Sequence, residues 1–84
     1  MKMKEILNRL EAAIKASNAA DEAWENDPES VEAEAEFQRT YEVEYSIRRE
    51  LAKAITDLTN EIDADTALKM TYNPKLAELI GMMA

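Results

Sequence analysis

The acidic side chains of residues 21–36 are the densest concentration of charged groups in this chain. The stretch reads DEAWENDPESVEAEAE and contains no base. It holds eight acids: Asp21, Glu22, Glu25, Asp27, Glu29, Glu32, Glu34 and Glu36. Carboxylates in such numbers can attract a Lys/Arg-rich surface or imitate an array of phosphates. They can also serve only to keep a small protein in solution, and the sequence leaves both interpretations open.

The rest of the chain lacks the residue types that most enzymes need. It has no cysteine and no histidine, which excludes Ser-His and Cys-His nucleophiles, and it lacks the usual ligands of zinc. Asp63-Ala-Asp65 begins like a calcium loop, but Ala67 and Leu68 stand where a ligand and a glycine are needed. We therefore expect a protein without catalytic activity, without a metal site and without a cofactor.

Net charge limits the kind of partner. The chain of 84 residues carries −8, and residues 21–36 alone carry a charge of that size. Affinity for phosphates comes from Lys and Arg, so we expect no direct binding of nucleic acid and instead a protein partner with a Lys/Arg-rich surface. The N-terminal residues have charges every few positions and no apolar run for a signal or a membrane span. We expect a single domain in the cytoplasm, with no membrane contact.

Composition predicts an all-α fold. One glycine and two prolines in 84 residues, with abundant Ala, Glu, Leu, Lys and Arg, are typical of helices. A first helix is predicted over about 3–25, because its apolar residues fall at steps of three and four on one face. Those residues are Met3, Ile6, Leu7, Leu10, Ala13, Ile14, Ser17, Ala20 and Trp24.

A turn at residues 26–28 and a second helix over about 28–62 complete a long antiparallel helical hairpin. Asp27 is predicted to cap this helix and Pro28 to occupy its first position. Short helical segments over about 64–70 and 74–80 are predicted to pack over the open end of the hairpin. Glu44 and Arg48 lie four apart within the apolar stripe of the second helix, where they can form an internal ion pair or a polar site.

At the predicted hairpin tip, several acidic residues destabilise the helices that contain them. Asp21 with Glu25, and Glu32 with Glu36, are like charges four apart, each costing about 0.2–0.5 kcal/mol. A local cost without a structural gain suggests function. Trp24 can be an anchor for a partner, or it can pack within the hairpin on Val31 or Ala35. The predicted partner-binding residues are Asp21, Glu22, Trp24, Glu25, Glu29, Glu32 and Glu36.

In size, acidity and helicity the chain resembles many small phage-encoded proteins, including inhibitors of bacterial defence nucleases and DNA mimics. The resemblance is one of kind and covers no specific residues. It implies a non-enzymatic protein that blocks a basic, nucleic-acid-binding surface of its partner. Two alternatives remain: a homodimer or other helical-bundle assembly through the stripe of the second helix, and a protein that sequesters a small ligand or nucleotide with Tyr41, Tyr45 and Arg48.

Overall fold

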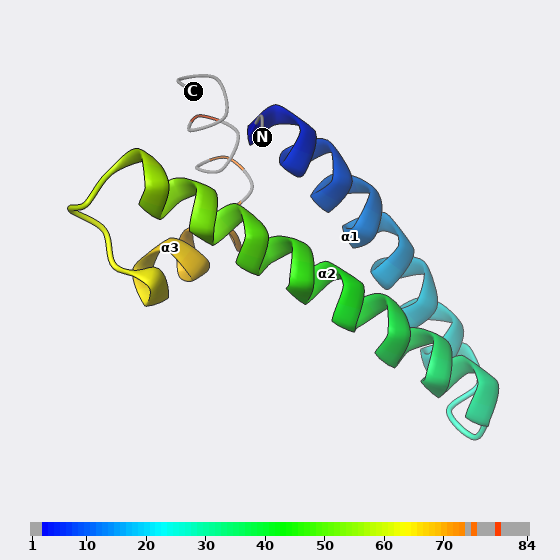
Figure 1. The fold of residues 1–84 in the computed structure, drawn as a ribbon. Helices are drawn as coiled ribbons and strands as arrows, with labels where there is room; N and C mark the ends of the chain where they lie inside the picture. The colour runs from blue at the N-terminus through cyan, green and yellow to red at the C-terminus, as the bar shows by residue number, and fades with distance from the viewer. Residues whose placement is uncertain (1–2, 74, 76–78, 80–84) are drawn as a thin grey trace.

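Two long helices form an antiparallel hairpin, and a short third helix packs on the second (Figure 1). The computed structural model describes residues 3–73, 75 and 79. Helix α1 spans Met3–Asn26, α2 spans Val31–Leu58 and α3 spans Ala64–Met70. The fold is therefore all-α, as the sequence predicts. The helix predicted over 74–80 lies, apart from residues 75 and 79, outside the described residues.

The core lies between the two long helices, toward the end of the hairpin away from the turn. Side chains three and four positions apart share one face of a helix, so a single stripe of each helix is buried. On α1 the stripe runs through Met3, Ile6, Leu10 and Ala13. On α2 it runs through Ile47, Leu51, Ala52 and Ile55. Ala67 of α3 completes this cluster and is fully buried.

Nearer the turn, the buried residues are small or polar. Ser17 and Ala20 of α1 and Thr40 of α2 are buried there. The Thr40 hydroxyl donates to the backbone carbonyls of Glu36, at 3.0 Å, and Phe37, at 2.9 Å, so its polar group is satisfied within its own helix. The molecule measures 46 × 21 × 20 Å, and its apolar volume is concentrated in the half away from the turn.

The connection between α1 and α2 is longer than predicted. The Ser30 N–H donates to the Asp27 carbonyl at 3.1 Å, which closes a turn with Pro28 at its second position. Proline is favoured there because its fixed φ suits the turn. The Ser30 hydroxyl then accepts the Ala33 N–H at 3.1 Å and caps α2. The prediction that Asp27 caps the helix and that α2 begins at Pro28 is wrong.

The far end of α2 is earlier than predicted. The helix ends at Leu58, and Thr59 is extended, with φ −149° and ψ 139°. The Thr59 hydroxyl accepts the Glu61 N–H at 3.2 Å, which supports a turn in place of another helical step. Ile62 lies beyond the helix but still packs, half-buried, against the core. The predicted helix end at residue 62 is therefore wrong, although this residue reaches the core from the connection.

Helix α3 begins at a carboxylate cap. Asp63 Oδ1 accepts the Thr66 N–H at 2.7 Å, as expected for an aspartate before the first helical residue. This backbone hydrogen bond holds the pKa of Asp63 below its ordinary value, with smaller contributions from the Thr66 side chain and from Lys69. The cap fixes the start of α3 in the predicted segment 64–70.

A buried arginine joins α2 to the residues that follow α3. Arg48 Nε donates to Glu44 Oε2 at 2.9 Å, and the two side chains are 9% and 12% exposed, respectively. Arg48 Nη1 donates to the backbone carbonyl of Thr71, which is buried. The Tyr72 ring covers the guanidinium at 4.2 Å from its centroid. The pair is therefore internal, and it holds the end of α3 against α2.

Replacing Ser30 with alanine is expected to lower the free energy of unfolding by about 1 kcal/mol, because the Ala33 N–H loses its acceptor. Asp27→Ala is the comparison, and it should change stability by less than about 0.5 kcal/mol, because the Asp27 side chain is exposed and its capping role is absent. Urea unfolding followed by circular dichroism measures both. A greater loss for Asp27→Ala would place the start of α2 at Pro28.

Replacing Arg48 with methionine is expected to cost about 3 kcal/mol, because it leaves the Glu44 carboxylate buried without its partner. Glu44→Gln in the same chain should recover part of that loss by removing the uncompensated charge. The neighbouring Arg49 is exposed and forms no ion pair among the described residues, so Arg49→Met is the matched control. The idea is refuted if Arg48→Met and Arg49→Met have equal urea midpoints.

Candidate functional site

The acidic tip consists of residues 21–36: the end of α1, the turn and the start of α2. The structure brings the predicted site residues together at this one end of the hairpin (Figure 1). Asp21 is partly buried at the flank of α1. The other predicted acids are exposed: Glu22, Glu25, Glu29, Glu32 and Glu36. Their carboxylates are therefore available to a partner without unfolding either helix.

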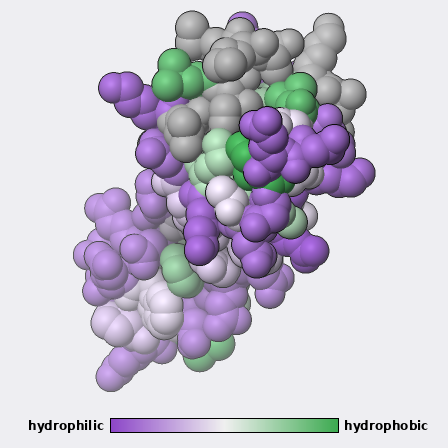
Figure 2. Space-filling view, turned by 90° about the vertical axis from the view of Figure 1, so that its left-hand side faces the viewer, coloured by the Kyte–Doolittle hydropathy of each residue, from purple (hydrophilic) through white to green (hydrophobic). Residues whose placement is uncertain are grey.

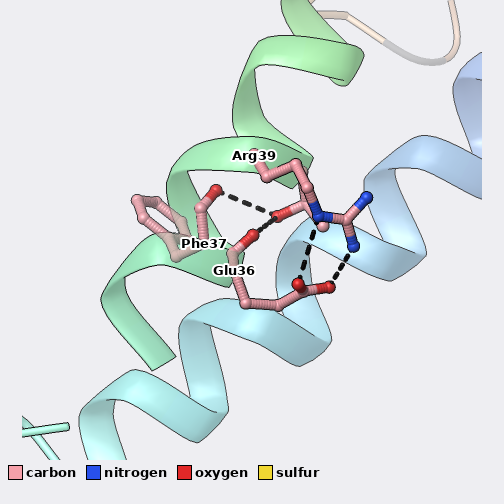
Figure 3. Close-up of polar contacts among 4 residues, drawn as sticks. Glu36, Phe37 and Arg39 are labelled. Atoms are coloured by element: carbon pink, nitrogen blue, oxygen red, sulfur yellow. Dashed lines mark hydrogen bonds and ion pairs between the residues drawn. The ribbon is translucent and has the colours of Figure 1, made fainter. Parts of the chain in front are cut away.

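One acid of the tip is neutralised. Arg39 Nε donates to Glu36 Oε2 at 3.2 Å, and its Nη2 binds the other carboxylate oxygen (Figure 3). This hydrogen bond, together with the attraction of the carboxylate, raises the pKa of Arg39. Among the residues that the structure describes, the other seven acids of the stretch form no ion pair. Glu36 is thus less available to a partner than the exposed acids of the tip that form no ion pair.

The helix ends add to the negative field on one side of the tip only. The last turn of α1 contains no base, so its exposed carbonyls lie beside Glu22 and Glu25 without compensation. The first turn of α2 contains Glu32 and Glu34, which the positive end of that helix favours. The end of α1 is therefore the more strongly negative part of the tip.

Trp24 is held inside the hairpin by Phe37. The two ring centroids are 5.3 Å apart, with the rings tilted by 35°. The indole is partly buried, whereas Val31, one of the two neighbours expected from the sequence, is 78% exposed. Phe37 was not predicted as the neighbour of Trp24, because the four-residue turn sets a different register between the two helices. Trp24 therefore serves hairpin packing, and only its remaining surface can meet a partner.

In comparisons with known proteins, no family model, no curated protein and no solved structure matches this chain. Its chemistry is therefore judged from its own residues. Among those that the structure describes, no three acids are arranged to hold a metal ion. Over the same part of the chain, no helix has the length and apolar character needed to cross a bilayer.

A row of aromatic rings continues from the tip along α2. Phe37 and Tyr41 lie 6.2 Å apart between centroids, and Tyr41 and Tyr45 are stacked at 6.5 Å with an angle of 11° between their rings. Tyr41 and Tyr45 remain 47% and 37% exposed. Tyr72 lies close by, and its pKa is raised by partial burial first and by Tyr41 second. The row thus links the tip to the region where α3 packs.

An open groove of about 930 Å³ lies beside this row, between α2 and α3. Its aromatic wall is Tyr41 and Tyr45, as the ligand-binding alternative supposed. Arg48 is not part of the wall: it is buried, its Nε donates to Glu44 and its Nη1 donates to the Thr71 carbonyl. The cations that do line the groove are Arg49 and Lys53, which were not among the residues predicted to bind a ligand.

Phe37→Ala is expected to shift the fluorescence of Trp24 to longer wavelength and to lower the free energy of unfolding by at least about 1 kcal/mol. The chain has one tryptophan, so its emission reports on this contact alone. Tyr41→Ala is the control, since it removes an exposed ring one turn farther along α2. Equal emission spectra for Phe37→Ala and the unaltered chain would contradict the packing of Trp24 on Phe37.

Proposed function

We propose that this chain is a non-enzymatic inhibitor that binds a Lys/Arg-rich surface of another protein through its acidic tip. In this proposal the tip imitates an array of phosphates and blocks a nucleic-acid-binding surface. The observation that supports it is the set of seven carboxylates at one end of the hairpin without an ion pair among the described residues. A phage-type inhibitor or DNA mimic is the class that this arrangement fits.

The placement of the core supports the same proposal. The large buried side chains lie toward the other end of the hairpin, so the tip acids do not face the apolar cluster. Carboxylates on two adjacent helices and the turn between them give a charged surface of fixed geometry. Such a surface accelerates association with an oppositely charged partner, and the effect weakens as salt increases.

In this proposal, Trp24 fixes the spacing of the two helices at the tip and adds little surface to the contact with the partner. Because its ring packs on Phe37, it holds the end of α1 against the start of α2. The exposed acids on both helices, Glu25 and Glu32 among them, then keep a constant spacing. A rigid array loses little conformational freedom on binding, which favours affinity.

The test uses a synthetic Lys/Arg-rich peptide as a basic probe and the emission of Trp24 as the signal. Charge reversal at Glu25, Glu29 and Glu32 is expected to weaken binding of the peptide at least about tenfold at low salt. Adding salt should weaken binding of the unaltered chain steeply. A labelled DNA bound to the same peptide should be displaced by the unaltered chain and not by the triple variant.

The control is a second triple reversal with the same change in net charge. Glu5, Asp57 and Glu61 are exposed and lie outside the tip, so their reversal to lysine should weaken binding only slightly. Circular dichroism of both variants verifies that the helices are intact. Equal losses in the two triple variants would show that net charge alone drives binding, and the tip would then be only a solvated surface.

A further inference from the structure

The outward face of α2 carries a second arrangement of charges, which begins within the acidic tip at Glu34 and continues along the helix to Lys53. A row at steps of three and four along this face runs through Val31, Ala35, Gln38, Glu42, Tyr45, Arg49, Ala52 and Thr56. Most of this row is exposed, and its part from Glu42 onward lines the groove beside α3. Ala52 is buried in the core and Thr56 is half-buried, so the uncovered part of this face runs from Val31 to Arg49.

Charges on this face change sign about its middle. Glu42 and Arg49 lie three and four residues to either side of Tyr45. Farther out on the same two sides lie Glu34 and Lys53, both exposed. None of these four side chains forms an ion pair within the described part of the chain. Arg49 and Lys53 are like charges four apart, so they repel one another in an isolated chain.

We infer that this face binds a second copy of the chain, with the two α2 helices antiparallel about a two-fold axis near Tyr45. In such a pair the acidic half of one face meets the basic half of the other, twice over. Glu42 then lies near Arg49 of the second copy, and Glu34 lies near its Lys53. The face is thus complementary to itself, which identifies its occupant as the same chain.

The groove offers a contact for the exposed apolar side chain at the start of this face. Val31 is 78% exposed at the start of α2, where none of the residues that the structure describes covers it. In the antiparallel pair it falls opposite Thr56 of the second copy, at the end of the groove lined by Ala64 and Leu68. The exposed ring of Tyr45 lies at the centre of the pair. The apolar groups would then bury one another at the middle and at both ends.

The view from the side of the α2–α3 connection shows mostly hydrophilic side chains, with apolar ones in separate small patches (Figure 2). Because the proposed contact sets Glu42 near Arg49 and Glu34 near Lys53, association is expected to depend on charge as well as on apolar contact, and so on salt. Of the tip acids, Glu34 takes part in this contact, whereas Glu25, Glu29 and Glu32 do not. An antiparallel pair places the two acidic tips at opposite ends, so dimer formation and tip binding can be tested separately.

A charge swap tests the arrangement by sedimentation velocity. Two double variants are made, Arg49→Glu with Lys53→Glu, and Glu34→Lys with Glu42→Lys. Each alone places like charges opposite one another, and its dimer dissociation constant should rise at least about tenfold above that of the unaltered chain. An equimolar mixture restores both sets of opposite charges and should dimerise again. The chain with all four substitutions should form a homodimer.

The outcomes that overturn the inference are distinct. An unaltered chain that stays monomeric at low salt and high protein concentration has no such dimer, and the groove then serves another occupant. Another such outcome is association that is lost on reversal of Glu25, Glu29 and Glu32 and kept with Glu34→Lys and Glu42→Lys. That result would mean that the acidic tip of one copy binds Arg49 and Lys53 of the next. A mixture no better than either double variant also contradicts the two-fold pairing.

Discussion

The charge of Arg48 is the constraint on which the packing of α3 depends. A buried guanidinium must be paired and hydrogen-bonded, because an unpaired charge away from water is costly. One partner, Glu44, lies on the same helix, but the other is the Thr71 carbonyl, 23 residues along the chain. The ion pair adds little net stability over apolar side chains of the same size. Its effect is to favour one position of α3, since displacing Thr71 would leave the Arg48 donor and that carbonyl unsatisfied.

This arrangement divides the hairpin into two unequal parts. Large apolar side chains such as Ile6, Leu51 and Ile55 are fully or almost fully buried in one half, where α3 and the Arg48 contacts add to the core. The half with the turn holds together through small buried residues and the Trp24–Phe37 contact. Because few core contacts depend on that half, its exposed positions can carry many like charges without disrupting the fold.

The sequence predicts the hairpin well, because periodicity selects one buried face of α1 and Asp63 marks the start of α3. It places the ends of α2 less well. A proline after an aspartate suits both a helix start and a turn, and the turn is found here because Ser30 offers a cap two residues later. The acids of residues 21–36 do lie at one end of the hairpin, but the contacts of their side chains were not predictable. That Arg39 binds Glu36, and that Trp24 packs on Phe37, depends on rotamers and register that a pattern does not contain.

Distance keeps the tip acids from being neutralised by the unpaired bases of the same helix. Glu32 and Arg49 are 17 residues apart on α2, which is about 25 Å at about 1.5 Å per residue. At physiological ionic strength the screening length is about 8 Å, so Arg49 and Lys53 scarcely reduce the field at the tip. A straight helix thus separates two charged regions that a compact fold would bring together. The two proposed partners, a basic surface at the tip and a second copy along α2, are therefore compatible.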